Sequence, residues 1–391
     1  MQFEDIGRRN FLKTMGAAGM LSTLPEAAFG LHAGSGQIAH EAAAPGADED
    51  AKPKHSIKFA VIGLDHPHIM GITAAVIRGG GKLAAFYSTL PRESAGFQKL
   101  YPQARLAKSE DEILDDPSIQ LVASASIPNL RAPLGVRVMK HGKDYLSDKP
   151  AITTLQQLVE VRKVSAATGK IFAIMYSERL EVRAAVQAGY LVKAGAIGKV
   201  VQTINIAPHQ VNAPSRPDWF WDPAQYGGIL CDIGSHQADQ FVYYTGSTTA
   251  AVTASQIANV NHRDHPGFQD FGDMMLQGNG GAGYVRVDWF TPDGLGVWGD
   301  GRLFILGTEG YIELRKYIDI AGRPSGNHLF IADKKQTRYM DCSNVVLPFG
   351  LQFVADIVNR THTAQDQQQA LLAAELVLKA QKNAKRLSFP A

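Results

Sequence analysis

The sequence predicts an α/β protein of two domains: a doubly wound parallel sheet, then an α+β domain with an open-faced, mainly antiparallel sheet. The chain has 391 residues, which is long enough for two domains. From residue 56 to 176, short apolar runs alternate with helical patterns, as in a parallel sheet covered on both faces. From residue 177 to 391, longer runs alternate apolar and polar residues, which is typical of antiparallel strands with one exposed face.

The first domain is expected to hold five strands with helices between them. The apolar runs that predict strands are 57–62, 82–87, 121–125, 144–146 and 171–175. Helical spacing of apolar residues covers roughly 67–78, 92–101, 109–115, 131–141 and 153–168. Because parallel strands need crossover connections, these helices should lie on the faces of the sheet with right-handed crossovers.

The second domain is expected to begin with a helix and continue mostly as strands. The sequence predicts helices over about 179–195, 226–244, 350–360 and 365–385. The alternating runs that predict strands are 200–207, 251–260, 271–277, 283–290, 302–306, 311–316 and 328–332.

Composition excludes some classes of function. Hydrophobic residues make up 45% of the chain and charged residues 19%, and the formal net charge is +2. Because the basic residues form no continuous block, we expect no nucleic-acid binding. The two cysteines, Cys231 and Cys342, match no zinc or redox spacing. We expect free thiols, although one disulfide remains open.

The N-terminus indicates export. Residues 7–13 (GRRNFLK) resemble a twin-arginine signal except for the glycine at its first position, and a weakly apolar run too short to span a bilayer follows. We therefore expect a signal peptide over 1–33, a linker over 34–55 and export by the twin-arginine translocase, to the periplasm or otherwise out of the cytoplasm.

The turn after the first strand is unusual. Residues 61–70 read VIGLDHPHIM, where many α/β proteins carry G-x-G-x-x-G and bind a dinucleotide. Only Gly63 remains of these glycines, and Asp65 and His68 occupy the other two positions. A carboxylate facing a phosphate would be repelled, so we expect Asp65 to cap the following helix. The helix N–H groups would still favour a phosphate, and His66 and His68 could donate to it.

A metal site is the alternative interpretation of the same turn. Asp65, His66 and His68 are suitable ligand types, but no HxxxH or similar spacing supports them. We predict no metal site.

Two further segments carry chemically useful side chains. Lys149 follows the strand over 144–146, where side chains of a parallel sheet reach the ligand crevice, and a cis bond to Pro150 is plausible. Asp232, His236 and Asp239 are spaced by four and three residues, so they share one face of a helix. A carboxylate one turn from a histidine can fix its tautomer. Each feature could instead be structural, with Lys149 an exposed turn residue and His236 a core residue.

Together these segments resemble the glucose–fructose oxidoreductase/inositol dehydrogenase (Gfo/Idh/MocA) family over about residues 56–385. The resemblance rests on Pro128-Asn129, Asp148-Lys149-Pro150, the AGAIG turn at 194–198 and the GG-x₃-D-x-G-x-H-x₂-D segment at 227–239. It implies a Rossmann domain and hydride transfer between NAD(P) and a sugar or polyol. It also implies that Lys149, Asp232 and His236 are catalytic.

These residue types suit that chemistry. An imidazole can accept the hydroxyl proton as hydride leaves carbon, and Lys149 can stabilise the developing alkoxide. Asp232 would orient His236 or bind a neighbouring hydroxyl. Aromatic and polar residues near these segments could contact a carbohydrate, although core packing is an alternative for the aromatic ones. The candidates are Tyr176, Arg179, Trp221, Asp239, Trp298 and Arg302.

The nucleotide contacts depart from the family pattern in places. Ser88 ends the second strand where NAD enzymes often carry an acid, and Arg92 could pair with a 2′-phosphate, so NADP is slightly favoured. Leu130 and Arg131 follow Asn129 where the family usually has a histidine. The expected cofactor contacts are Gly63, Asp65, His66, His68, Ser88, Arg92, Pro128, Asn129 and Lys149.

Export constrains the reaction. An exported enzyme has no free nicotinamide pool, so we expect a tightly held NAD(P) that is regenerated in place. The partner is expected to be a carbohydrate, and a homo-oligomer is expected because open sheets of this kind often pair. A redox-neutral glycosidase or lyase, and a sugar-binding protein that has lost the dinucleotide, remain alternatives.

Overall fold

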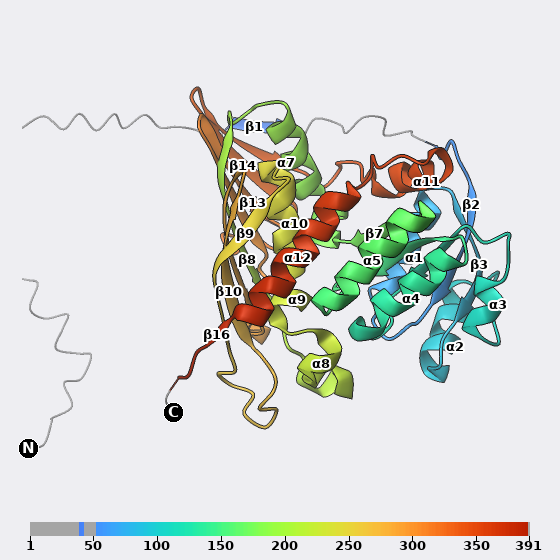
Figure 1. The fold of residues 1–391 in the computed structure, drawn as a ribbon. Helices are drawn as coiled ribbons and strands as arrows, with labels where there is room; N and C mark the ends of the chain where they lie inside the picture. The colour runs from blue at the N-terminus through green and yellow to red at the C-terminus, as the bar shows by residue number, and fades with distance from the viewer. Residues whose placement is uncertain (1–38, 43–51, 390–391) are drawn as a thin grey trace, which may run out of the picture. The chain divides into compact units, whose positions relative to one another are not determined.

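The computed structural model describes residues 39–42 and 52–389. The expected signal peptide and most of the expected linker lie outside these residues. The described part forms a six-stranded sheet and a ten-stranded sheet (Figure 1). None of its helices is long and apolar enough to cross a membrane. Cys231 and Cys342 are both buried free thiols, as expected.

The six-stranded sheet is parallel throughout and confirms the doubly wound first domain. Its order is β4-β3-β2-β5-β6-β7. The strands are β2 (Ile57–Ile62), β3 (Gly81–Tyr87), β4 (Arg105–Leu106), β5 (Leu121–Ser124), β6 (Asp144–Asp148) and β7 (Phe172–Met175). The helices are α1 (Ile69–Arg78), α2 (Pro91–Leu100), α3 (Glu110–Leu114), α4 (Pro128–Lys140) and α5 (Leu155–Thr168).

The chain reverses its direction across this sheet between β2 and β5. From β2 it runs outward to β3 and β4, and it then returns to β5 on the other side of β2. In open α/β sheets, ligands bind outside the carboxyl ends of the strands at such a reversal. The Gly63 turn, Pro128 and Lys149 follow the carboxyl ends of β2, β5 and β6. The topology therefore brings three predicted segments to one edge.

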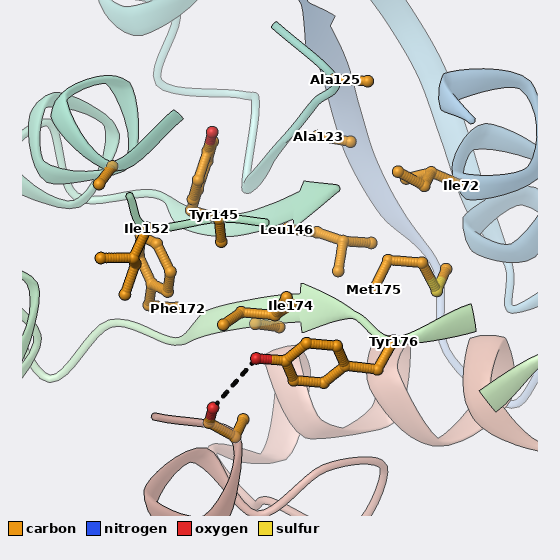
Figure 2. Packing of buried hydrophobic residues seen from close by; sticks show 14 of the residues in the cluster. Ile72, Ala123, Ala125, Tyr145, Leu146, Ile152, Phe172, Ile174, Met175 and Tyr176 are labelled. Atoms are coloured by element: carbon orange, nitrogen blue, oxygen red, sulfur yellow. Dashed lines mark hydrogen bonds between the residues drawn. The ribbon is translucent and has the colours of Figure 1, made fainter. Parts of the chain in front are cut away.

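The core of this domain is apolar on both faces of the sheet. Tyr145, Leu146, Phe172 and Ile174 are fully or almost fully buried where β6 and β7 pair (Figure 2). Burying a side chain of this size stabilises the fold by roughly 1.5–3 kcal/mol relative to exposing it. This packing fixes where β6 ends and therefore where Lys149, the next residue, lies.

The ten-stranded sheet is mainly antiparallel and confirms the second domain. Its order is β1-β15-β14-β13-β12-β8-β11-β10-β9-β16. The strands are β1 (Ala39–Ala42), β8 (Val200–Pro208), β9 (Ala250–Ala258), β10 (Phe271–Gly278), β11 (Gly281–Asp288), β12 (Arg302–Gly307), β13 (Gly310–Arg315), β14 (His328–Asp333), β15 (Thr337–Asp341) and β16 (Lys385–Arg386). Burial alternates along β10 and β12, so one face is packed and the other is more open.

Helices cover the packed face. In Figure 1, α7, α9, α10 and α12 lie along one side of the large sheet. The helices of this half of the chain are α6 (Ser177–Leu180), α7 (Arg183–Lys193), α8 (Pro223–Tyr226), α9 (Ile229–Asp232), α10 (Gly234–Thr245), α11 (Phe349–Asn359) and α12 (Gln367–Asn383).

Two expected helices are interrupted, and four short strands were not predicted. The helix expected over 179–195 breaks at Glu181 and Val182, where Val182 is extended. The helix expected over 226–244 divides into α9 and α10 at Ile233. The strands β1, β4, β15 and β16 lack a run of alternating apolar residues long enough to predict them. One of them, β1, lies inside the expected linker and pairs with the edge strand β15.

The edge strand β7 is closed by two side chains from the end of the chain. Gln365 accepts from the Ile174 N–H at 3.0 Å and donates to the Ile174 carbonyl at 2.9 Å. Gln367 accepts from the Phe172 N–H at 2.8 Å. These glutamines take the place of a neighbouring strand, and they tie the α12 region to the first domain.

Position 63 requires glycine because the turn after β2 lies very close to Ser126. Its φ is +84°, a conformation that other residues adopt only with strain. Its N–H donates to the Tyr87 carbonyl at 2.9 Å. A Cβ at this position would lie 1.9 Å from Ser126 Oγ and 2.9 Å from Ser126 Cα. There is consequently no room for a side chain between the Gly63 turn and the segment after β5.

We predict that Gly63→Ala lowers the free energy of unfolding by about 2–5 kcal/mol, through backbone strain and steric overlap. Gly71→Ala is the matched control, because Gly71 lies inside α1 and a Cβ added there would have no atom within 4 Å. Its change should be at most about 1 kcal/mol and stabilising. Urea unfolding of both variants measures the difference, and equal effects would contradict the steric argument.

Candidate active site

A cavity of about 270 Å³ lies where the carboxyl ends of β2, β5 and β6 face the second domain. The first domain contributes His66, Pro67, His68, Pro128, Arg131 and Lys149 to its lining. The second domain contributes charged residues, histidines and aromatic rings, among them Glu178, His209, Asp232, His236 and Trp298. The cavity therefore joins the two predicted catalytic segments.

Lys149 and Asp232 form a direct ion pair in this cavity. Lys149 Nζ lies 2.9 Å from Asp232 Oδ1, and the exposed fractions of the two side chains are 4% and 14%. The cis bond between Lys149 and Pro150 is present, as expected. Burial opposes ionisation of Asp232, but the Lys149 ammonium and its hydrogen bond lower the pKa of this carboxyl overall. The pair thus presents a carboxylate and an ammonium together.

His236 lines the same cavity and is buried. Its Nδ1 has no hydrogen-bond partner among the described residues. Burial lowers the pKa of His236 to about 3; Glu178 opposes the shift, and Lys149, His68 and His209 add to it. The imidazole is therefore neutral at neutral pH, with an unpaired ring nitrogen.

Of the two roles expected for Asp232, orienting His236 is not supported by a contact. Among the described residues, the Asp232 carboxylate hydrogen-bonds to Lys149, and His236 Nδ1 has no partner. Asp239 is absent from the cavity lining. The backbone of Ile233, between α9 and α10, stays in the right-handed helical region, so it is the pairing of Asp232 with Lys149 that the sequence spacing did not reveal.

A buried charged network that the sequence analysis did not identify lies beside His236. Glu178 Oε2 is 2.6 Å from Lys316 Nζ and accepts from Gln237 at 3.0 Å. Lys316 also donates to Gln240 at 2.8 Å. Burial opposes ionisation of Glu178, but Lys316 and nearby histidines lower its pKa overall. Because Glu178 follows the carboxyl end of β7, the reasoning applied to Lys149 could have found it.

The turn after β2 forms a second cluster on the cavity wall. His66 Nδ1 lies 3.3 Å from Asp148 Oδ2, and His68 Nδ1 lies 3.0 Å from Asp148 Oδ1. Buried Arg131 reaches the same carboxylate, with Nη2 3.1 Å from Oδ2. Burial opposes ionisation of Asp148, but His68 and Arg131 hold its pKa well below the usual range.

The fold brings together ligand-type side chains that their spacing along the sequence did not connect. One ligand-type atom from each of His66, His68 and Asp148 lies within 4.8 Å of the others. The expectation of no metal site rested on the spacing within the turn alone. That reasoning missed Asp148, because it follows eighty residues later and joins the histidines only through the fold.

Comparison with known proteins assigns the chain to a family. A family model described as "Oxidoreductase family, NAD-binding Rossmann fold" matches residues 57–176, and one described as "GFO/IDH/MocA C-terminal domain" matches residues 185–313. A solved structure from Erwinia carotovora atroseptica SCRI1043, assigned as an oxidoreductase, is 45% identical with a TM-score of 0.83. The match covers 85% of this chain and 100% of that one. The chain belongs to the GFO/IDH/MocA oxidoreductase family.

Curated relatives are more distant. D-xylose dehydrogenase from Paenarthrobacter nicotinovorans is 24% identical, and the match covers 32% of this chain and 34% of that protein. Inositol 2-dehydrogenase 2 from Saccharopolyspora erythraea is 23% identical over 68% of this chain and 76% of that protein. The chain thus spans about a third of the first relative and about three quarters of the second.

Membership in this oxidoreductase family implies a nicotinamide nucleotide, and the cavity fits its reacting end. Pro128, Lys149 and His236 line the cavity. Within the described part of the chain, the buried atoms that make no hydrogen bond include His236 Nδ1 and the Oδ1 of Asn129, the residue after Pro128. The Asn129 carbonyl accepts from Gln157 at 2.9 Å, which fixes the start of α4. Unpaired buried polar atoms are rare unless a ligand or water satisfies them.

The expectation that Asp65 caps α1 was wrong. The N-cap of α1 is His68, and no side chain caps it. Asp65 is half-buried and does not line the cavity. Burial raises the pKa of Asp65, while a backbone hydrogen bond and Arg131 oppose the shift.

The residues expected to contact a 2′-phosphate lie just after the end of β3. Ser88 Oγ accepts from the Leu90 N–H at 3.1 Å. Arg92 is exposed in the first turn of α2. Ser88 therefore occupies the position at which NAD enzymes often carry an acid, as the sequence indicated.

The expected substrate contacts divide into those that line the cavity and those that do not. Trp298 lines the cavity, with ring centroids 4.5 Å from His209 and 4.4 Å from Tyr317. Trp219 lines it in place of Trp221, whose ring stacks on His265 with centroids 4.0 Å apart.

The remaining expected substrate contacts do not line the cavity. Tyr176 is buried in the core, where its hydroxyl donates to the Ala370 carbonyl at 3.2 Å (Figure 2). Arg179 and Asp239 form a buried bidentate ion pair with each other at 2.6 and 2.9 Å. Arg302 pairs with Asp300. These side chains have structural partners, which spacing along the sequence could not reveal.

We predict that the protein loses stability as pH falls below about 6.5. The pKa of His236 is near 3 when folded and near 6.5 when unfolded. Below pH 6.5 the unfolded chain therefore binds a proton that the folded chain does not, and stability falls with pH until the folded pKa is reached. From pH 7 to 5, His236 should account for a loss of up to about 2 kcal/mol.

Urea unfolding at several pH values, with the wild-type chain and His236→Gln, measures this contribution. The variant should show a weaker pH dependence between pH 5 and 7. The exposed residue His362 provides the control, and His362→Gln should leave the dependence unchanged. An unchanged dependence in His236→Gln would contradict a neutral buried imidazole.

Proposed function

We propose that the chain transfers hydride between NAD(P) and a hydroxyl-bearing carbon of a sugar, polyol or glycoside. The observation that carries this proposal is the convergence of Lys149, Asp232 and His236 on one cavity at the carboxyl edge of the parallel sheet. The names of the xylose and inositol dehydrogenases support the substrate class. When bound, the nucleotide supplies or accepts the hydride.

The chain's own residues handle the proton and the charge. A lysine ammonium has three N–H donors, and Asp232 takes one from Lys149 at 2.9 Å. The remaining donors can hydrogen-bond to the reacting oxygen and stabilise an alkoxide. The neutral imidazole of His236 offers a lone pair to the hydroxyl proton, but with a pKa of about 3 it is a weak base, so the Lys149 ammonium must supply most of the stabilisation of the alkoxide. Asp232 keeps this ammonium in place.

The cavity wall also suits a carbohydrate. Trp219, Trp298 and Tyr317 offer apolar ring faces, while Gln210 and Arg216 offer hydrogen-bonding groups. Sugars present both C–H faces and hydroxyl groups, so a mixed wall of this kind matches them better than an apolar pocket would. We propose that these side chains bind the substrate in place of the expected Tyr176, Arg179, Trp221, Asp239 and Arg302.

We predict that Lys149→Met and His236→Gln each lower kcat/KM for oxidation of the best sugar or polyol by about 10²–10⁴-fold. The matched controls are Lys140→Met and His141→Gln, which alter exposed residues near the end of α4. The nucleotide absorbance during turnover of a substrate panel measures the rates. Activity within threefold of wild type in both cavity variants would refute the proposed roles.

A redox-neutral reaction is a second candidate. Export, which the twin-arginine-like sequence at residues 7–13 indicates, is compatible with it and equally with a net oxidation in which a second sugar takes the hydride back. Oxidation, bond cleavage or epimerisation, and reduction on one substrate would leave the nucleotide unchanged. Product analysis separates the two: a lactone or keto-sugar indicates net oxidation, whereas a cleaved glycoside or an epimer indicates a redox-neutral cycle.

We further propose that the chain is exported with tightly bound nucleotide, and that the nucleotide is NADP. Residues 7–13 lie outside the described part of the chain, so export depends on their sequence alone. NADP is favoured because Ser88 replaces an acid and Arg92 lies exposed nearby.

Full-length protein from an expressing bacterium should be found outside the cytoplasm and should release about one equivalent of NADP on denaturation. A double variant, Arg8→Lys with Arg9→Lys, should stay in the cytoplasm. Mass spectrometry of the released nucleotide and fractionation measure the outcome. Exported protein without nucleotide would instead favour the sugar-binding alternative.

A homo-oligomer remains a proposal. Large apolar side chains are exposed on strands of the ten-stranded sheet: Val201, Met275, Leu306 and Tyr311. Burying such side chains against a second copy would be favourable.

A further inference from the structure

We propose that His66, His68 and Asp148 bind one divalent transition-metal ion in the wall of the cavity. The two histidines come from the turn that replaces the glycine-rich loop, and the aspartate ends β6. Two imidazoles and one carboxylate suit Mn²⁺, Fe²⁺, Co²⁺ or Zn²⁺. This inference concerns a binding site and does not depend on the proposed hydride transfer.

The candidate ligand atoms lie close enough to approach one ion. Ligands about 2.0–2.2 Å from a metal and separated by 90–110° lie roughly 3.0–3.5 Å apart. His66 Nδ1 is 3.3 Å from Asp148 Oδ2, and His68 Nδ1 is 3.0 Å from Asp148 Oδ1. One ligand atom from each of the three side chains lies within 4.8 Å of the others, so binding would draw them closer together. The two imidazole rings have centroids 4.0 Å apart and are nearly perpendicular, so they are not stacked face to face.

The two oxygens of the Asp148 carboxylate have different partners. Asp148 is 1% exposed, and within the described residues its Oδ2 makes no hydrogen bond but is ion-paired, with Arg131 Nη2 at 3.1 Å and His66 Nδ1 at 3.3 Å. The other oxygen, Oδ1, accepts from the Lys149 N–H at 2.8 Å and lies 3.0 Å from His68 Nδ1. The Lys149 N–H holds the carboxylate in one orientation.

His66 Nδ1 lies 3.3 Å from Asp148 Oδ2 and 3.4 Å from the His68 backbone nitrogen. A protonated Nδ1 donates to the carboxylate, whereas a deprotonated Nδ1 and Asp148 Oδ2 are both acceptors and can share a cation. Metal binding at this position would therefore displace the proton from His66 Nδ1.

Arg131 sets a condition on the ion's remaining ligands. Its guanidinium donates to the Ser126 carbonyl at 2.6 Å and to the Lys149 and Pro150 carbonyls, so it is fixed in place. Its positive charge already balances Asp148 and weakens the attraction for a second cation. The site should therefore prefer an ion that also binds oxygen donors carrying negative charge or large dipoles.

Such donors can enter from the cavity. His66 and His68 both line it, and His68 is 42% exposed. Three protein ligands leave at least one coordination position open, as in catalytic rather than structural metal sites. A water, or a hydroxyl or carbonyl oxygen of a carbohydrate in the same cavity, would complete the coordination shell.

The test is direct metal binding by the full chain, freed of any affinity tag and treated with a chelator. Titration with Co²⁺ should give visible absorption bands that saturate at one equivalent, and Zn²⁺ should abolish them by competition. His68→Gln should weaken Co²⁺ binding at least about tenfold, and Asp148→Asn should do the same. His362→Gln, which changes an exposed histidine outside the cavity, should bind as the wild type does.

Folding is checked separately, because Asp148 is buried and its loss could unfold the chain. Circular dichroism should show a folded His68→Gln variant, since this side chain is partly exposed. Absence of saturable binding at one equivalent in the wild type, or equal affinity in folded His68→Gln, would overturn the proposal. Neither outcome depends on turnover, so failure here leaves the proposed hydride transfer standing, and an inactive enzyme leaves the metal site standing.

Discussion

The buried contact between Arg131 and Asp148 organises the edge of the parallel sheet where the cavity lies. Arg131 is 1% exposed, and its guanidinium joins the segment after β5, the end of β6 and the Lys149–Pro150 backbone. Removing one partner of a buried ion pair leaves an uncompensated charge and commonly costs about 3–5 kcal/mol. Because Lys149 directly follows Asp148, this contact also sets where the ammonium meets Asp232. Two segments far apart in sequence are thereby held at one place.

Several charged side chains in and beside the cavity are held in ion pairs. Lys149 is matched by Asp232, and Glu178 by Lys316. Burial lowers the pKa values of His66, His209 and His236 to about 3–4, so these imidazoles are neutral at neutral pH. Neutral imidazoles can accept protons or bind metal ions, whereas protonated ones can do neither. The arrangement therefore keeps several nitrogen lone pairs available in a small volume.

The sequence predicted the fold well because long apolar runs determine it. The five main strands of the first domain and the seven long strands of the second were found within a few residues of their ends. Short polar strands such as β4 and β16 were missed, since pairing with a neighbour creates them and local sequence does not. The break at Ile233 was missed for a related reason: helical spacing continues across it.

Residues of the candidate site could be predicted from the sequence only where they follow the carboxyl end of a parallel strand. Lys149 was found because the carboxyl end of a parallel strand has a known place, and the same rule would have identified Glu178. The partners of Asp148 and Asp232 come from distant segments, so spacing along the chain did not reveal them. Tyr176 and Arg179 were chosen by residue type, and the structure gives each a partner outside the cavity.

The glutamines that close β7 have a consequence for how the chain is made. Gln365 and Gln367 are synthesised about 190 residues after the strand whose backbone they satisfy. Until then, the first domain carries an open strand edge that can pair with other chains. A nascent chain emerging from the ribosome therefore remains vulnerable to aggregation until Gln365 and Gln367 have been translated. Deletion of the last helices would uncover α10 and β9 in the second domain and, at the same time, leave the outer edge of β7 in the first domain unpaired.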